Sequence, residues 1–415
     1  MTNTQQLGEL AKIAARTLAT TGTDKKNAAL TAIAAALLEK TPQILAANVI
    51  DMAAAKENNM REALLDRLLL TEARIKGIAD GVLEVVALPD PVGRFDRMST
   101  RPNGLQIGQK RVPLGVIAFI YEARPNVTVD GAALCLKSGN AVILRGGKEA
   151  YNSNLVFTEI MREVLRANDL PEDCVSLVSD LTRESVTELM NLTGYVDLLI
   201  PRGNAGLIDN VTKNSKVPVV QTGVGNCHIY VDESADLEMG AEIIFNAKCS
   251  RPSVCNAAET LLVDRSIAAK FLPIAKAKLV EKDTELRGCA ETRAILLDAI
   301  VATEEDYYTE FLDYTLAIKV VDGLDEAIAH ITKYGSGHSE AIVTNNYTAS
   351  QRFLDEIDAA AVYVNASTRF TDGGVFGLGA EIGISTQKMH ARGPMGIEQL
   401  TSTKFVVYGS GQVRW

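Results

Sequence analysis

The first 88 residues read as a long helical region. Two stripes of apolar residues recur at spacings of three and four: Leu30, Ile33, Ala34, Leu37 and Leu38, and then Leu64, Leu65, Leu68 and Leu69. Spacing of this kind is typical of helices that bury one face. The Asp-Pro-Val-Gly-Arg segment at 90–94 contains two helix-breaking residue types, and it predicts the end of this helical layer.

From Pro113 the pattern changes to short apolar runs separated by helical segments. The runs that predict buried strands are 115–120, 141–144, 174–178, 196–200 and 217–220. Segments with helical spacing, such as 154–166 and 183–190, lie between them. This alternation predicts a doubly wound parallel sheet, in which ligands bind at the carboxyl ends of the strands.

A second α/β unit follows, with strand-like runs at 259–263, 316–321, 340–343 and 361–364. The Asn-Gly pair at 103–104 predicts the turn of a small β-hairpin. We therefore expect a first domain at 1–100 and 113–233, and a second at 234–400. The hairpin at 101–112 and a tail at 401–415 are expected to stand apart and to pair across subunits.

Composition narrows the functional classes. The 415 residues are 47% hydrophobic and 23% charged, as in ordinary globular proteins, and the net charge of −10 disfavours nucleic acid and anionic membranes as partners. The six cysteines contain no CxxC pair and the four histidines are scattered, so we expect reduced thiols and no metal site. The N-terminus lacks a signal-peptide core and no apolar run approaches the ~18 residues of a membrane span, which predicts a cytoplasmic protein.

Two loops after predicted strands carry candidate ligand groups. Arg145-Gly146-Gly147-Lys148 follows the run at 141–144, where two glycines and two cations suit a phosphate group, although a plain turn with solvated charges fits the pattern equally well. Tyr121-Glu122-Ala123-Arg124 follows the run at 115–120. Its charged pair either contacts a ligand at the strand end or pairs with neighbouring residues.

A third candidate is Cys255, within the stretch Lys248-Cys249-Ser250-Arg251-Pro252-Ser253-Val254-Cys255-Asn256. An unpaired cysteine is more often a small core residue than a nucleophile. A free thiol titrates near ~8.5, so a nucleophilic role needs nearby positive charge, which Lys248 and Arg251 offer. Cys249 is the rival, but it ends a predicted helix, where the helix dipole disfavours a thiolate.

Five long strings make the identification more specific than any short motif. They are RVPLGVIAFIYEARPNVTVD, LCLKSGNAVILRGGKEA, RPSVCNAAETLLV, VYVNASTRFTDGG and STQKMHARGPMG. In this order, over residues 7–405, the chain resembles the aldehyde dehydrogenase superfamily and, within it, the gamma-glutamyl phosphate reductase family. The resemblance implies an α/β fold with a doubly wound Rossmann-type NADP-binding domain, an α/β catalytic domain and a small β oligomerisation element.

The resemblance also implies roles for individual residues. Cys255 occupies the position of the superfamily's catalytic cysteine. The implied cofactor-binding residues are Arg145, Gly146, Gly147 and Lys148, Gly203 and Asn204 near the pyrophosphate, and Glu310 at the nicotinamide ribose. Lys148 replaces a glutamate that is common in NAD-preferring members, so the resemblance implies NADPH. Arg124, Lys248, Arg251 and Arg369 are the candidate cations for the substrate's phosphate and α-carboxylate.

Two departures from the superfamily pattern indicate the reaction type. The segment 219–226 lacks the glutamate that activates water in hydrolytic members, which suits a thioacyl intermediate that must wait for hydride. The usual oxyanion asparagine is also absent, leaving the Cys255 backbone N–H as one expected donor.

The implied reaction is the NADPH-dependent reduction of L-glutamyl 5-phosphate to L-glutamate 5-semialdehyde in proline biosynthesis. The implied partners are further copies of the chain, as a homo-oligomer, and the glutamate 5-kinase that makes the substrate. Alternatives are a reductase of the same fold that uses an acyl-CoA, and a non-catalytic member of the fold.

Overall fold

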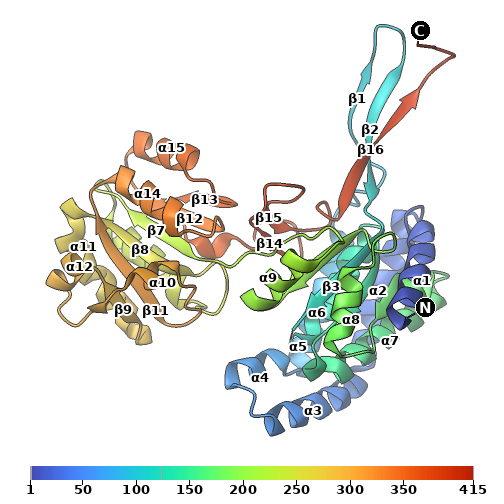
Figure 1. The fold of residues 1–415 in the computed structure, drawn as a ribbon, viewed down its shortest axis with the longest axis horizontal. Helices are drawn as coiled ribbons and strands as arrows, with labels where there is room; N and C mark the ends of the chain where they lie inside the picture. Colours follow the sequence, from blue (N-terminus) through green and yellow to red (C-terminus); the bar gives the residue numbers. More distant parts are fainter. Residues whose placement is uncertain (1, 123, 415) are drawn as a thin grey trace. The chain divides into compact units, whose positions relative to one another are not determined.

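The computed structural model describes residues 2–122 and 124–414, so residues 1 and 415, the outermost positions of the expected first domain and tail, lie outside the described part. The chain forms two compact units (Figure 1). Unit 1 contains the chain up to Thr222, Gly377–Gly383 and the chain from Met395 onward. Unit 2 contains Gly223–Phe376 and Ile384–Pro394.

Unit 1 begins with the expected helical layer. Its helices are α1 (Asn3–Leu18), α2 (Thr23–Glu39), α3 (Thr41–Glu57), α4 (Glu62–Leu68) and α5 (Glu72–Ala87). Helix α1 starts at a capping box, in which the Thr2 side chain accepts from the Gln5 N–H and the Gln5 side chain accepts from the Thr2 N–H. The predicted helical region up to residue 88 is thus confirmed.

The sheet of unit 1 has four parallel strands in the order β5-β4-β3-β6. They are β3 (Val116–Tyr121), β4 (Ala141–Arg145), β5 (Val175–Leu177) and β6 (Leu198–Arg202). The central strand β3 is buried along its whole length. In chain order the strands run 3-2-1-4, the first part of the Rossmann order, so the crevice for a ligand lies where β3 and β6 end.

Three helices connect these strands, namely α6 (Pro125–Lys137), α7 (Tyr151–Ala167) and α8 (Arg183–Met190), and a fourth, α9 (Ala205–Asn214), follows β6. Short 3-10 turns lie at Lys148–Ala150 and Glu172–Cys174. The strand expected at 217–220 is reduced to a single bridge between Leu199 and Val219. Pro218 has no N–H to donate, which explains why the ladder does not extend.

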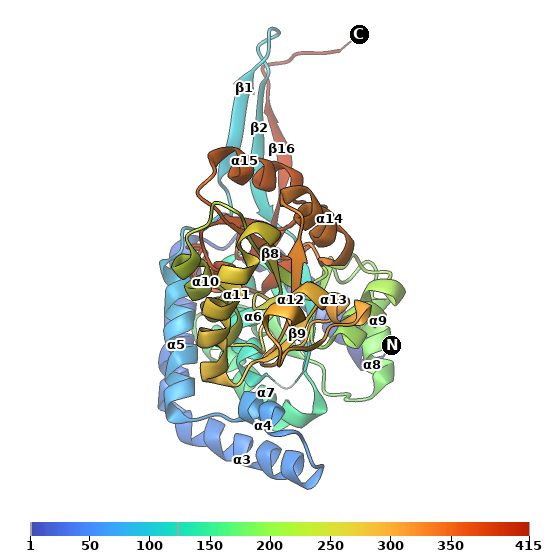
Figure 2. The ribbon, with the colours of Figure 1, turned by 90° about the vertical axis from the view of Figure 1, so that its left-hand side faces the viewer.

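Three antiparallel strands form an arm of unit 1 in the order β1-β2-β16, with β1 (Phe95–Thr100), β2 (Gln106–Pro113) and β16 (Thr401–Tyr408). Both views show these strands extending away from the helices of the unit (Figures 1 and 2). Asn103-Gly104 lies in the turn, as expected, with Gly104 at a φ of 85°. The terminal strand β16 pairs with β2 of its own chain, so β1 and β16 are the edges of this sheet. Pairing of these edges with another subunit stays a prediction.

Unit 2 contains a seven-stranded parallel sheet in the order β10-β9-β11-β8-β7-β12-β13. The strands are β7 (Cys227–Val231), β8 (Ala258–Asp264), β9 (Glu285–Gly288), β10 (Ile300–Val301), β11 (Thr315–Val321), β12 (Ser339–Val343) and β13 (Ala361–Val364). Four of them match the expected runs. The units divide at Thr222–Gly223 and not after residue 233, because β7 pairs with both β8 and β12.

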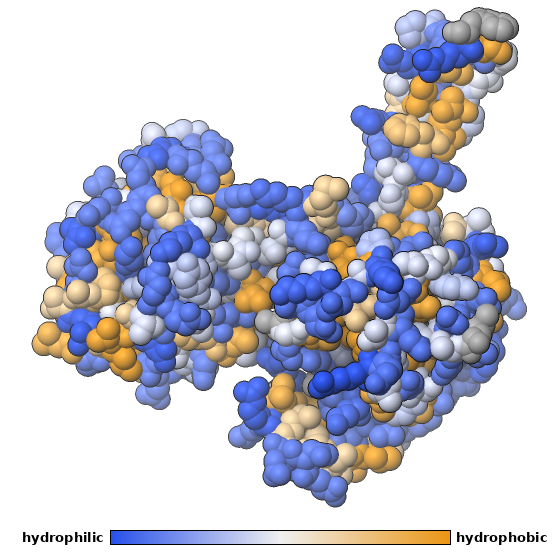
Figure 3. Space-filling model, viewed as in Figure 1, coloured by the Kyte–Doolittle hydropathy of each residue, from blue (hydrophilic) through white to orange (hydrophobic). Residues whose placement is uncertain are grey.

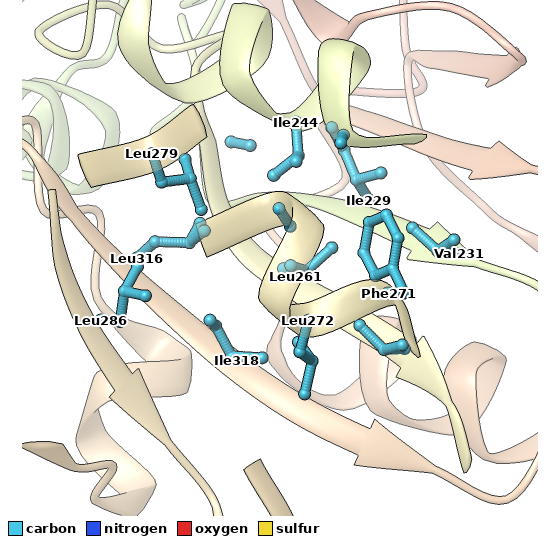
Figure 4. Close-up of a cluster of buried hydrophobic side chains, with 14 of the residues drawn as sticks. Ile229, Val231, Ile244, Leu261, Phe271, Leu272, Leu279, Leu286, Leu316 and Ile318 are labelled. Atoms are coloured by element: carbon cyan, nitrogen blue, oxygen red, sulfur yellow. The ribbon is translucent and has the colours of Figure 1, made fainter. Parts of the chain in front are cut away.

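Helices cover both faces of this sheet. On one face α10 (Leu237–Cys249) and α11 (Arg265–Leu279) pack over a buried cluster that includes Ile229, Ile244, Leu261, Phe271 and Ile318 (Figure 4). On the other face α14 (Leu324–Tyr334) and α15 (Tyr347–Glu356) pack over Tyr230, Leu262, Ile331, Ile342 and Phe353. Successive residues of a strand point to opposite faces, which places Ile229 and Tyr230 in different clusters.

The remaining elements are short. They are the helices α12 (Ala290–Ile295) and α13 (Glu304–Tyr308), the 3-10 turns Val280–Lys282 and Thr368–Phe370, and the paired strands β14 (Gly383–Ser385) and β15 (Gly393–Met395). Within the described ranges, no helix combines the length and the apolar character that crossing a membrane requires.

Candidate active site

The nucleophile loop, residues 250–257, connects α10 to β8 in unit 2. Cys255 lies in this loop and is partly exposed, whereas the rival Cys249 at the end of α10 is buried. Burial raises the pKa of the Cys249 thiol, and the helix end offers no stabilisation for a thiolate. The geometry therefore favours Cys255 over Cys249 as a reactive thiol.

Asn256, the residue after Cys255, anchors the loop to the segment 368–371. Its side-chain Nδ2 donates to the carbonyl oxygens of Arg369 (3.2 Å) and Thr371 (2.9 Å). In the other direction, the Thr368 hydroxyl donates to the Asn256 carbonyl oxygen at 2.7 Å. Asn256 and Thr368 are both buried, so these bonds fix the backbone that carries Cys255.

Two arginines gather at the nucleophile loop. The Arg369 guanidinium donates from Nε to Ser250 Oγ at 3.1 Å and from Nη1 to Asn256 Oδ1. Burial and the neighbouring charge of Arg251 lower the pKa of Arg369, while the charges of Asp372 and of the Cys255 sulfur raise it. Arg251 is exposed. The site thus holds two like charges near a thiol, an arrangement that an anion would stabilise.

The other two candidate cations are placed differently. Lys248 is fully buried, and its Nζ lies 2.5 Å from Glu259 Oε2, which is equally buried. Burial raises the pKa of Glu259 to about 7 against the opposing effect of Lys248. This favours a structural role for Lys248. Arg124 belongs to unit 1, at the start of α6.

The segment 223–227, which leads into β7, packs against the nucleophile loop. A Cβ built on Gly225 would lie 1.5 Å from the Cys255 carbonyl oxygen. The Gly225 N–H donates to Glu310 Oε1 at 2.8 Å, and burial raises the pKa of the Glu310 carboxyl. The Cys227 thiol donates to the same Cys255 carbonyl at 3.2 Å. Gly225 and Cys227 were not among the predicted site residues; the only signal for them in the sequence is the closely spaced glycine pair Gly223 and Gly225.

In unit 1, the loop after β4 holds the residues expected to bind the cofactor. Arg145 ends β4 with a buried guanidinium, which donates to the carbonyl oxygens of Gly146 (2.6 Å), Leu181 (2.8 Å) and Thr182 (3.0 Å). Burial lowers the pKa of Arg145. Because the guanidinium N–H groups donate to these carbonyl oxygens, Arg145 stabilises the conformation of the loop.

Gly146, Gly147 and Lys148 complete this loop. An added Cβ at Gly146 would lie 2.2 Å from Asn154 Nδ2, and this buried nitrogen has no hydrogen-bond acceptor among the described residues, although the amide oxygen accepts from the Thr128 hydroxyl at 2.8 Å. Lys148 is exposed and makes no ion pair with any residue in 2–122 or 124–414. An orphaned donor under the loop and an unpaired cation on it fit a phosphate-bearing ligand.

Gly203 and Asn204 lie where β6 leads into α9. The Asn204 side chain caps the helix by accepting from the Leu207 N–H at 2.9 Å. The Glu122 carboxylate accepts from the Asn204 N–H at 3.0 Å and from its Nδ2 at 2.9 Å. Of the two alternatives for Glu122, pairing with a neighbouring residue is therefore the one observed. The carboxylate lies at the N-terminus of α9, a position that favours an anion.

Comparison with known proteins identifies the family. Residues 2–286 match the aldehyde dehydrogenase family. The chain is 61% identical to the gamma-glutamyl phosphate reductase of Carboxydothermus hydrogenoformans over 408 residues, covering 98% of each chain. It is 60% identical to that of Halothermothrix orenii over 401 residues, covering 97% of this chain and 96% of the relative.

Solved structures agree. The crystal structure of the gamma-glutamyl phosphate reductase of Thermotoga maritima covers the whole of both chains, with a TM-score of 0.98 and 50% identity. An acetylating aldehyde dehydrogenase of Geobacillus thermoglucosidasius shares the fold, with a TM-score of 0.72 and 18% identity over 99% of this chain and 97% of the other. The chain therefore belongs to the aldehyde dehydrogenase family of oxidoreductases, and within it to the gamma-glutamyl phosphate reductases.

Proposed function

We propose that this enzyme reduces L-glutamyl 5-phosphate to L-glutamate 5-semialdehyde and phosphate, with NADPH as reductant and Cys255 as nucleophile. The single observation that carries the proposal is a partly exposed thiol on a hydrogen-bonded loop beside Arg251 and Arg369. Relatives of about the same length that are 60% and 61% identical bear the name of this activity. The reaction supplies a precursor for proline.

In the first step the Cys255 thiolate attacks the acyl carbon. A carbon–sulfur bond forms and the bond from carbon to the phosphate oxygen breaks; phosphate leaves with that electron pair and takes a proton from solvent. Arg369 and Arg251 offset the negative charge of the thiolate and of the substrate's anionic groups. Phosphate is a good leaving group, so this step needs no strong general acid.

In the second step the thioacyl group is reduced. The nicotinamide cofactor, when bound, supplies the hydride to the thioacyl carbon. The resulting thiohemiacetal collapses as its carbonyl forms again, and the Cys255 thiolate leaves. No acidic residue occurs at 219–226. Without such a base to activate water, the thioacyl group is spared hydrolysis before reduction.

Residues of unit 1 would hold the cofactor. Lys148 would meet the 2′-phosphate of NADPH, because it is exposed and has no acidic partner in the described part of the chain. Arg145, Gly146 and Gly147 would shape the loop around the ribose. Gly203 and Asn204 would lie near the pyrophosphate, and Glu310 of unit 2 would bind the nicotinamide ribose.

The decisive experiment is the reverse reaction, because the acyl phosphate is unstable. Purified enzyme receives semialdehyde, inorganic phosphate and NADP⁺, and the absorbance of NADPH is followed. We expect NADPH only when phosphate is present, no activity with Cys255→Ala, and near-normal activity with the matched control Cys249→Ala. Activity of the Cys255→Ala variant would refute the assignment of Cys255 as the nucleophile. Equal rates with coenzyme A in place of phosphate would refute an acyl phosphate as the substrate.

We also propose that the arm makes the enzyme a homo-oligomer. Its edge strands carry exposed apolar side chains, among them Met98 (50% exposed), Phe405 (64%) and Val407 (53%). Figure 3 shows hydrophobic atoms along this arm. Exposed edge strands with apolar side chains pair readily with another copy. We expect the double variant Phe405→Lys, Val407→Asp to have a lower assembly mass by light scattering than the unchanged enzyme. An unchanged mass would exclude the arm as the contact between subunits.

A further inference from the structure

Three successive carbonyl groups of the nucleophile loop are held by hydrogen bonds from the chain itself. The donors are the Ala257 N–H to Val254 O (3.0 Å), the Cys227 thiol to Cys255 O (3.2 Å) and the Thr368 hydroxyl to Asn256 O (2.7 Å). The outer two bonds are the common kinds that close a turn and tie a loop to a neighbouring segment. The middle bond is unusual, since a thiol is a weak donor.

The Cys255 carbonyl oxygen, at 3.2 Å, is nearer to the Cys227 thiol than His338 Nδ1, which lies 3.7 Å away and is itself 2.8 Å from Ser339 Oγ. Cys227 is the first residue of β7 and is fully buried, and β7 lies beside β8, into which the nucleophile loop runs. Burial, with a smaller contribution from the charge of Glu340, raises the pKa of the Cys227 thiol well above its usual range. The thiol therefore keeps its proton and remains a donor to the Cys255 carbonyl.

Gly225 holds the same carbonyl by contact. Because a Cβ at this position would lie 1.5 Å from Cys255 O, the carbonyl rests directly on the Gly225 backbone. The Gly225 N–H is in turn held by Glu310 Oε1 at 2.8 Å. With Gly225 packed against it and the Cys227 thiol bonded to it, the peptide that joins Cys255 to Asn256 has one orientation.

That orientation determines where the Asn256 N–H points. In a planar trans peptide the C=O and N–H bonds point in opposite directions, so the Asn256 N–H is directed away from Cys227. Within residues 2–122 and 124–414, no acceptor takes a hydrogen bond from this N–H. The N–H that follows a nucleophile forms part of the oxyanion hole in the α/β-hydrolases, which shows that an N–H one residue on can reach the reacting carbonyl.

We propose that Cys227 is a positioning residue whose thiol fixes the peptide between Cys255 and Asn256, so that the Asn256 N–H donates to the oxyanion formed on the substrate carbonyl. The proposal rests on the proposed function, in that Cys255 must be the nucleophile. The Asn256 N–H would then take the place of the side-chain donor of the superfamily's usual oxyanion asparagine, which this sequence lacks. The expected Cys255 N–H would act beside it.

The test compares Cys227→Ala, which removes the donor, with Cys227→Ser, which keeps one. Loss of an oxyanion donor costs ~10²–10³ in kcat, and misorientation of a retained donor about 10-fold or more. We expect kcat of Cys227→Ala in the reverse reaction to fall about 10–100-fold with little change in KM, and Cys227→Ser to recover most of it. If thermal melting shows that Cys227→Ala is unfolded, Cys227→Val replaces it, because valine fills the volume without a donor.

A second readout separates positioning from general damage. Alkylation of Cys255 by iodoacetamide passes through no oxyanion, so its rate, followed by peptide mapping, should be unchanged in Cys227→Ala. Cys174→Ala removes another fully buried cysteine, in unit 1, and should lower the melting temperature without lowering kcat. Equal loss of alkylation and turnover in Cys227→Ala, or unchanged turnover, would overturn the proposal. Turnover by Cys255→Ala would instead overturn the proposed function.

Discussion

The Lys248 ammonium lies 2.5 Å from the Glu259 carboxylate, and neither side chain is exposed. Lys248 is in the last turn of α10 and Glu259 is at the start of β8, so the pair connects the two elements between which the nucleophile loop runs. A second Glu259 oxygen accepts from the Leu312 N–H at 3.3 Å. The pair therefore connects the two ends of the loop, and its ammonium is directed at Glu259.

Lys248→Met should consequently cost stability and not substrate affinity. Removing one partner of a buried ion pair leaves an uncompensated charge, which typically costs about 3–5 kcal/mol. Urea unfolding measures the loss, and Lys276→Met serves as control, because its ion pair with Asp298 is at the surface and should change stability by less than about 1 kcal/mol. A stable Lys248→Met variant with a raised KM for phosphate would instead make Lys248 a substrate ligand.

Gly225→Ala should lower activity about 100-fold while leaving the fold intact. The new Cβ would need the space of the Cys255 carbonyl oxygen, 1.5 Å away, so the nucleophile loop has to shift. Displacement of a reacting group by about 1 Å costs about 100-fold in rate. Gly77→Ala is the matched control, since nothing lies within 4 Å of its Cβ and alanine in the middle of α5 should add about 0.5–1 kcal/mol of stability. Full activity of Gly225→Ala would mean that the loop tolerates the shift.

Local patterns explain which parts of the fold were predictable. The helices up to residue 87 and strands such as β3 carry their own periodicity, and both were found. Strands β9 and β10 are four and two residues long, and the Glu-Leu-Arg-Gly of β9 lacks an apolar run. Their pairing comes from the neighbouring β11, which a local pattern does not reveal.

Single residues of the site could be predicted from the sequence, but their contacts with one another could not. Cys255 follows from the matching strings, but its contacts with Gly225 and Cys227 depend on β7 lying next to β8, and strand order is not written in the spacing of apolar residues. The sequence also does not reveal in which direction a cationic side chain points. Arg145 and Lys148 look alike in sequence, yet one guanidinium is buried among carbonyl groups while the other charge is exposed.

Lys148→Glu should shift the cofactor preference from NADPH towards NADH. A charge-assisted hydrogen bond to a phosphate contributes about 1.5–3 kcal/mol, so we expect kcat/KM for NADPH to fall about 10–100-fold. A glutamate in this place would also bind the free ribose hydroxyls of NADH. Lys148→Met provides the control that removes the charge without adding an acceptor. If the ratio of kcat/KM for NADPH and NADH is unchanged in Lys148→Glu, the 2′-phosphate does not bind at Lys148.

Glu122→Gln should tighten the binding of NADP⁺. The Glu122 carboxylate accepts from the Asn204 N–H at the start of α9, where the pyrophosphate is proposed to lie, so the two anions would compete. An anion at a helix N-terminus is worth about 0.3–1 kcal/mol, which corresponds to a change of about 2–5-fold in Kd. Fluorescence titration measures it, with the exposed Glu184→Gln on α8 as control. Weaker binding would show that the carboxylate is needed to order the start of α9.

His330→Phe should make the fold less sensitive to acid. His330 lies in α14 against the rings of Tyr307, Tyr334 and His228, and neither of its ring nitrogens has a hydrogen-bond partner among the described residues. Burial, with a smaller contribution from His228, lowers the pKa of His330 to about 2. Between that value and the unfolded pKa of 6.5 the unfolded chain binds the extra proton, so stability falls as the pH falls below 6.5.

At pH 5 this linkage costs the native protein about 2 kcal/mol, since each unit below the unfolded pKa is worth about 1.4 kcal/mol. Phenylalanine has no proton to bind and fills a ring-lined site, so the variant should lose less stability between pH 7 and pH 5, as measured by urea unfolding. Part of the slope should remain, because burial also lowers the pKa of His338, to about 4. Parallel pH dependence of the His330→Phe variant and the native protein would mean that His330 takes up its proton without unfolding.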